Sequence, residues 1–113
     1  MCSYKLLVHK KSGYITQCKG CTNYQVAFGT TVFNLSDADF KPFCDRISVL
    51  KLITVPNGFP NQKRIRIELP CCNSTMMVLN YKELKQLYEL TEEAMIMEEI
   101  DQLLNNNNLT SFS

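Results

Sequence analysis

The sequence predicts an α+β domain: one antiparallel sheet of about four to six strands, with two helices packed on one of its faces. Two observations support this fold class. Short segments in which apolar and polar residues alternate, as in half-buried strands, occur within residues 4–35 and 63–79. Each of these regions leads into a longer segment with apolar residues three or four positions apart, the spacing of an amphipathic helix.

The first region contains the clearest strands. Residues 4–9 (YKLLVH) and 14–18 (YITQC) are predicted strands joined by a short turn, and alternation resumes in YQVAF and again in TVFNL. Gly29-Thr30 interrupts the last two segments. A glycine at the start of a two-residue loop tolerates the positive φ of a hairpin turn, so a hairpin is one interpretation and a single strand with a bulge at Gly29 is the other.

A first helix is expected to begin at Ser36. Its hydroxyl can accept an unpaired backbone N–H of the first turn, and Asp37 and Asp39 lie at the positive end of the helix dipole. The apolar residues that follow form one stripe that is expected to lie on the sheet: Phe40, Phe43, Cys44, Ile47 and Leu50.

The second half of the chain resembles the first. After a loop rich in turn formers at residues 55–61, residues 63–69 (KRIRIEL) and 75–79 are predicted strands on either side of a turn at residues 70–74. Asn80 and Glu83 then form a helix-capping pair. The pattern LSxxDFxxF, which begins at residue 35, corresponds to LNxxELxxL 44 residues later. This correspondence suggests an internal duplication of a unit that consists of a strand, a cysteine-bearing turn, a strand and a capped helix.

The second helix carries more apolar surface than one sheet can cover. Residues expected to face the core are Leu84, Leu87, Tyr88, Thr91 and Met95. Its continuation adds Met95, Ile96, Ile100, Leu103 and Leu104. Such a surplus favours a homodimer through the C-terminal helix, and the alternative is a kink near Thr91 that lets one chain bury both faces. We expect a single domain at residues 1–104 and a polar tail at residues 105–113.

Charge and composition restrict the class of protein. The 113 residues carry a net charge of +1, so no overall field attracts nucleic acid or an anionic membrane. Lys and Arg outnumber Asp and Glu by 6 to 2 in residues 41–68, whereas the acids prevail by 7 to 2 in residues 69–113. We interpret the basic and the acidic segment as solvated faces of a strand and a helix. Nucleic-acid binding through Lys63, Arg64 and Arg66 is not expected.

Nothing in the sequence indicates export. The N-terminal segment has no apolar core of signal-peptide length, and no apolar run approaches the roughly 18 residues of a membrane span. We therefore expect a cytoplasmic protein without a membrane partner. In that compartment the six cysteines are expected to be reduced thiols or metal ligands rather than disulfides.

The cysteines are the candidate metal ligands. Cys18 and Cys21 have the spacing at which two thiolates bind one tetrahedral Zn²⁺, and Cys71 or Cys72 is the source of further ligands, completed by His9, Cys2 or water. The adjacency of Cys71 and Cys72 is unfavourable, because neighbouring side chains on extended backbone point apart. The alternative is that these are reduced thiols at sheet turns with no cofactor. A redox role is disfavoured because no helix begins at the CKGC motif.

No combination of residues predicts catalysis. His9 is the single histidine and has no plausible partner pair, no glycine-rich phosphate loop occurs, and the pairs Glu92-Glu93 and Glu98-Glu99 fit a solvated helix face. We therefore expect a protein that is not an enzyme.

Four segments carry a resemblance to a known family: the CxxC step, YQVAFG, FNLSDADF, and MMVLNYKEL leading into a leucine-rich helix. Across most of its length the chain resembles a family of short bacterial proteins of unknown function. The resemblance implies a small cytoplasmic α+β protein and assigns no catalytic residue. The function expected from the sequence is therefore a dimeric binding or interaction module with an unidentified protein partner, and the alternative is a structural zinc-binding protein.

Overall fold

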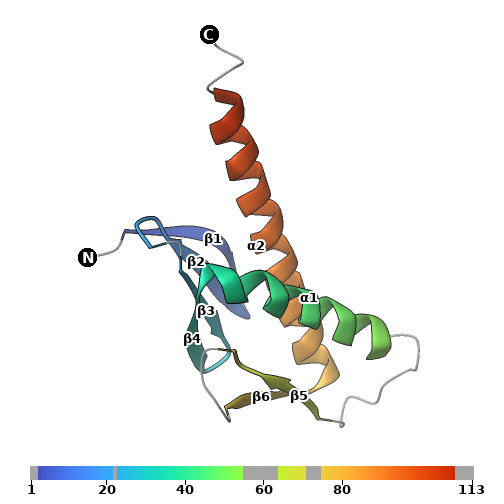
Figure 1. The fold of residues 1–113 in the computed structure, drawn as a ribbon. Coiled ribbons are helices and arrows are strands. Elements are labelled where there is room, and N and C mark those ends of the chain that lie inside the picture. Colours follow the sequence, from blue (N-terminus) through green and yellow to red (C-terminus); the bar gives the residue numbers. More distant parts are fainter. Residues whose placement is uncertain (1–2, 22, 55–63, 71–74, 109–113) are drawn as a thin grey trace.

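The α+β fold class is confirmed by the computed structural model, which describes residues 3–21, 23–54, 64–70 and 75–108. The described residues form two sheets and two helices. Figure 1 shows that the second helix is the longer one. In chain order the elements are β1 (Tyr4–Lys10), β2 (Gly13–Cys18), β3 (Tyr24–Phe28), β4 (Thr31–Leu35), α1 (Asp37–Thr54), β5 (Ile65–Glu68), β6 (Met76–Leu79) and α2 (Tyr81–Asn108).

The strands are divided between two antiparallel sheets. The first has the order β1-β2-β3-β4, and β5 pairs with β6 in a separate two-stranded sheet. The second sheet lies beside the β3–β4 turn, where residues 28–31 and 75–79 line a common hollow. The predicted strands and their antiparallel pairing are confirmed, but the prediction of one common sheet is wrong: among the described residues β5 and β6 pair with each other and not with a strand of the first sheet.

Gly29 forms the β3–β4 hairpin turn. Phe28 pairs with Thr31, so Gly29 and Thr30 are the two loop residues, and Gly29 has φ +60°. The positive φ is the conformation that glycine adopts without steric cost. The hairpin interpretation is therefore confirmed over the bulged single strand.

A bulge does occur in β1, where the register with β2 shifts between Leu6 and Val8. The bulge lets two successive side chains, Leu7 and Val8, both be buried, although alternation along a regular strand would expose one of them. The edge strand thereby contributes more apolar surface to the core than its length suggests.

Aromatic contacts join α1 to the inner face of the first sheet. Tyr24 on β3 stacks on Phe40 with ring centroids 3.8 Å apart and planes 6° apart. Phe33 on β4 meets Phe43 edge to face at 5.6 Å. The predicted apolar stripe of α1 is confirmed, because its residues are buried or pack against the core.

The helix α2 covers the other half of the same face. It packs against β1 and β2, and also against α1 and β6. Two ion pairs show that it runs antiparallel to β1, since Lys5 pairs with Asp101 and Lys10 pairs with Glu93 at 3.0 Å. Its fully buried residues include the predicted Leu84, Leu87 and Thr91, together with two that the sequence analysis missed, Leu90 and Ala94.

Both helices begin at the predicted caps. The Ser36 hydroxyl accepts the backbone N–H of Asp39 at 3.2 Å. At the second helix the pair is reciprocal: the Asn80 side chain accepts the N–H of Glu83 at 2.8 Å, and the Glu83 carboxylate accepts the N–H of Asn80 at 2.9 Å. These bonds satisfy backbone donors that have no partner within the helix.

A hairpin followed by a capped helix occurs twice, as β3-β4-α1 and β5-β6-α2. The cysteine-bearing turns do not correspond between the two units, however. The CKGC motif joins β2 to β3, whereas residues 71–74 lie between β5 and β6. The repeat therefore concerns the hairpin and the helix, and it does not place the two cysteine pairs at equivalent turns.

The helix α2 is helical through Asn108, so residues 105–108, the first part of the predicted tail, continue it. It is one element of 28 residues. The predicted loop at residues 55–61 and most of the predicted turn at residues 70–74 lie outside the described residues. In the part of the chain that the structure describes, no helix is both long and apolar enough to span a bilayer.

Gly13 is predicted to tolerate no side chain. A Cβ at this position would come within 1.9 Å of the carbonyl oxygen of Ala27, and a backbone atom in a paired strand cannot move aside. We expect Gly13→Ala to lower the free energy of unfolding by about 1–3 kcal/mol, the usual cost of overpacking. Urea denaturation followed by circular dichroism measures the change.

The matched control is Gly20→Ala, because a Cβ at Gly20 meets no atom within 4 Å. Equal stability of the two variants would contradict the close approach between β2 and β3 at Gly13.

Candidate functional site

The turn between β2 and β3 contains the two cysteines of the CKGC motif. Cys18 is buried and Cys21 is exposed. The backbone N–H of Cys21 donates to Sγ of Cys18 at 3.4 Å, and the N–H of Cys18 donates to the carbonyl of Asn23 at 2.7 Å. The turn therefore closes over one thiol and leaves the other accessible to solvent.

The other predicted metal ligands are not brought to this turn within the described residues. Cys2, Cys71 and Cys72 lie outside those residues, and His9 is exposed on β1. Across residues 3–21, 23–54, 64–70 and 75–108, no three His, Cys, Asp or Glu side chains are grouped so that they could hold an ion. The four-cysteine zinc site therefore stays a prediction.

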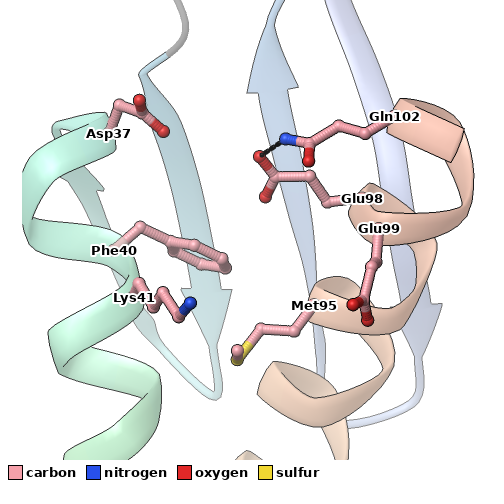
Figure 2. Close-up of a pocket in the computed structure, with 7 residues that line it drawn as sticks. All are labelled: Asp37, Phe40, Lys41, Met95, Glu98, Glu99 and Gln102. Carbon is pink, nitrogen blue, oxygen red and sulfur yellow. Dashed lines mark hydrogen bonds between the residues drawn. The ribbon is translucent and has the colours of Figure 1, made fainter. Parts of the chain in front are cut away.

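A cleft of about 380 Å³ lies between the first turns of α1 and the C-terminal half of α2. Figure 2 shows Asp37, Phe40 and Lys41 reaching in from α1 toward side chains of α2. On the side of α2 the cleft is lined by Met95, Glu98, Glu99 and Gln102. The Gln102 amide donates to Glu98 at 3.5 Å. Three carboxylates and one lysine make the cleft negative, so it attracts cations rather than anions.

Tyr24 lies between the sheet and this cleft. Its ring is stacked on Phe40, and its hydroxyl accepts a hydrogen bond from the Gln17 amide at 3.2 Å. Burial, followed by the hydrogen bond with Glu98 and the charge of that carboxylate, raises the pKa of Tyr24 well above its usual value. The hydroxyl therefore stays protonated beside Glu98, and this contact links α2 to a central strand of the sheet.

This contact of Glu98 was not predicted from the sequence. The pair Glu98-Glu99 fits a solvated helix face, but the structure half-buries Glu98 beside Tyr24. The signal that could have revealed the contact is Tyr24 itself. It falls on the inner face of an otherwise apolar strand, and a buried tyrosine hydroxyl needs a polar partner.

The outward side of the C-terminal half of α2 is apolar and uncovered. Its residues are 39 to 56% exposed, although all are large hydrophobic side chains: Ile96, Met97, Ile100, Leu103 and Leu104. We call these five residues the α2 stripe. On a helix of 3.6 residues per turn they share one side, away from the buried residues such as Leu87 and Ala94. Figure 1 shows this end of α2 projecting beyond the sheets.

A second surface, only partly exposed, is the outer face of the first sheet. Two cross-strand rows form it: His9, Tyr14, Ala27 and Val32, and Leu6, Thr16, Gln25 and Asn34. None of these residues is Asp, Glu, Lys or Arg, although solvated sheet faces usually carry charges. Leu6 and Val32 are more than half exposed. A protein surface could cover this face without removing a formal charge from water.

These features define a small α+β protein with two helices on one face of a sheet, an acidic cleft between them and an apolar helix end. The model of a family of unknown function, DUF6686, matches residues 1–111, and the chain belongs to that family. No curated protein and no solved structure matches the chain.

The structure predicts different reactivities for its thiols. Burial, with smaller effects of Asp45 and Glu98, raises the pKa of Cys44 to about 12, and Cys18 is buried beneath its turn. At pH 8 we expect iodoacetamide to modify Cys21 at least about tenfold faster than Cys44, because the protonated thiol is a poor nucleophile. Peptide mapping by mass spectrometry measures both rates.

The pKa of the Cys44 thiol is higher in the folded protein than the value of about 8.5 for an unfolded thiol. The buried thiol therefore contributes its full stabilisation below about pH 8.5, and this contribution is lost as the pH rises toward 12.

The labelling experiment has a control in denaturant, which should abolish the difference between Cys44 and Cys21. Equal labelling of the two residues in the native protein would contradict the packing of α1 on the sheet.

Proposed function

We propose that this protein is a small cytoplasmic interaction module that works as a homodimer and has no catalytic chemistry of its own. The observation that carries the proposal is the α2 stripe, an apolar surface that the described part of the chain leaves uncovered. The absence from the sequence of a recognisable catalytic motif supports a role in binding.

The burial of α2 supports a partner for the stripe. One side of the helix is already filled by the sheets and α1, with Leu84, Leu87 and Leu90 fully buried. The stripe lies on another side and cannot reach the same core. Contiguous exposed apolar surface of this kind is uncommon on soluble monomers and usually marks an interface. Burial of the stripe by a partner therefore removes from water a surface that is costly to leave exposed.

The oligomeric state tests the proposal. We expect the purified protein to dimerise with a dissociation constant in the micromolar range. Ile100→Glu should raise this constant more than about a hundredfold, since an unpaired charge buried at an interface costs about 3–5 kcal/mol. Analytical ultracentrifugation measures both values. Because Ile100 is exposed within one chain, we expect the substitution to change the monomer fold little.

The matched control is Leu52→Glu, which makes the same chemical change at an exposed position near the end of α1. It should leave the dimer intact. A wild-type protein that stays monomeric throughout the micromolar range would remove the main support for the proposal.

A structural zinc site is the second candidate function. The observation that favours it is the pairing of Cys18 and Cys21 in one tight turn, with an N–H directed at Sγ of Cys18. Such a bond stabilises thiolate, the form that binds zinc. In this proposal Cys71 or Cys72 supplies a third thiolate, and His9, Cys2 or water completes the set.

Metal content separates the two candidates. If zinc is structural, protein purified without added metal should contain about one Zn²⁺ per chain by elemental analysis, a chelator should lower the melting temperature, and Cys21→Ser should lose the metal. Since Cys21 is exposed, this substitution tests ligation with little effect on packing. Substoichiometric zinc, with a melting temperature insensitive to chelator, would reject the zinc proposal and leave the interaction module.

A further inference from the structure

We infer that the partner of the α2 stripe is a second copy of this chain whose α2 runs antiparallel, with Ile100 on the two-fold axis. This inference rests on the proposed function and specifies the occupant, direction and register of the interface. It follows from the positions of the stripe residues, the charges beside them and a hollow at one end of the stripe.

The stripe is symmetric about residue 100. In an antiparallel pair with that centre, Ile96 lies opposite Leu104 of the other copy, Met97 lies opposite Leu103, and Ile100 meets itself. Every stripe residue is thus matched with another stripe residue. A two-fold interface requires such self-complementarity, because each surface must accept its own copy.

The charges of α2 favour the antiparallel direction. Glu89, Glu92 and Glu93 lie on the same side of the helix, just before the stripe, and residues 105–108 beyond it are all asparagine. In the antiparallel register the positions opposite Glu92 and Glu93 are 108 and 107, which carry no charge. Parallel helices would bring the glutamates of both copies together, and like charges in close apposition are repulsive.

A hollow of about 370 Å³ lies where the C-terminal end of the other copy's α2 would be placed in this register. It is lined by Lys10, Tyr88, Ile96 and the three glutamates, and it continues the stripe toward the start of α2. Its walls are held in place, since Lys10 pairs with Glu93 at 3.0 Å and the Lys51 ammonium lies 4.6 Å from the Tyr88 ring centre. The position opposite Ile96 is Leu104, so the apolar end of one helix enters the hollow of the other.

The pairing leaves the acidic cleft open. Glu98 and Gln102 line that cleft from a different side of α2, so neither lies in the stripe. The helices would be in contact from residue 92 to residue 108, a length of about 24 Å at 1.5 Å per residue. An interface of that length is small, which predicts a dissociation constant in the micromolar range.

Disulfide cross-linking tests the direction and the register. Ile100→Cys should link to itself under mild oxidation, because residues on the axis approach within the Cα separation that a disulfide allows, about 4.4–6.8 Å. Ile96→Cys and Leu104→Cys should link to each other when the two variants are mixed, and neither should link efficiently to itself. Mass spectrometry of linked peptides identifies each pair despite the native cysteines.

The control is Lys85→Cys, an exposed position on α2 outside the contact region. Efficient self-linkage of Ile96→Cys would show a parallel pair and overturn the inference, as would linkage of Ile100→Cys no greater than that of the control. A dimer in sedimentation with either result would retain the proposed function and reject only this geometry. A monomer in sedimentation would reject both.

Discussion

The buried side of α2 is the contact on which the rest of the structure depends. This helix packs against β1 and β2 of the first sheet, β6 of the second sheet, and α1. Leu84, Leu87 and Leu90 are fully buried along it, and full burial of such a side chain stabilises the fold by about 1.5–3 kcal/mol. Among the described residues the two sheets are not joined by strand pairing, and α2 contacts both of them.

The same helix carries the candidate functional features on its remaining sides. Its 28 residues extend about 42 Å at 1.5 Å per residue, which is longer than the strands it covers. One side of the C-terminal half faces α1 across the acidic cleft, where Glu98 lies beside Tyr24, and burial together with this carboxylate raises the pKa of the Tyr24 hydroxyl. Another side presents the apolar stripe. Because a helix is rigid, anchoring its first half in the core positions both surfaces of its second half.

The candidate sites differ in how far local sequence could predict them. The CKGC turn is local, and its two thiols lie in the predicted turn between predicted strands, with one of them buried. The surplus apolar residues of α2 could also be read from their spacing. The cleft could not, because its walls come from Asp37 and Lys41 on one helix and from residues nearly 60 positions later on the other.

The sequence by itself determined the elements of this protein. The strands could be predicted from alternation, the helix starts from Ser36 and from the pair of Asn80 and Glu83, and a hairpin turn from Gly29. These elements could be predicted because strands, caps and turns depend on interactions among residues close in the chain. Only the tertiary structure decided that the strands form two sheets and that Glu98 meets Tyr24. These contacts join distant segments through packing, which no local pattern encodes.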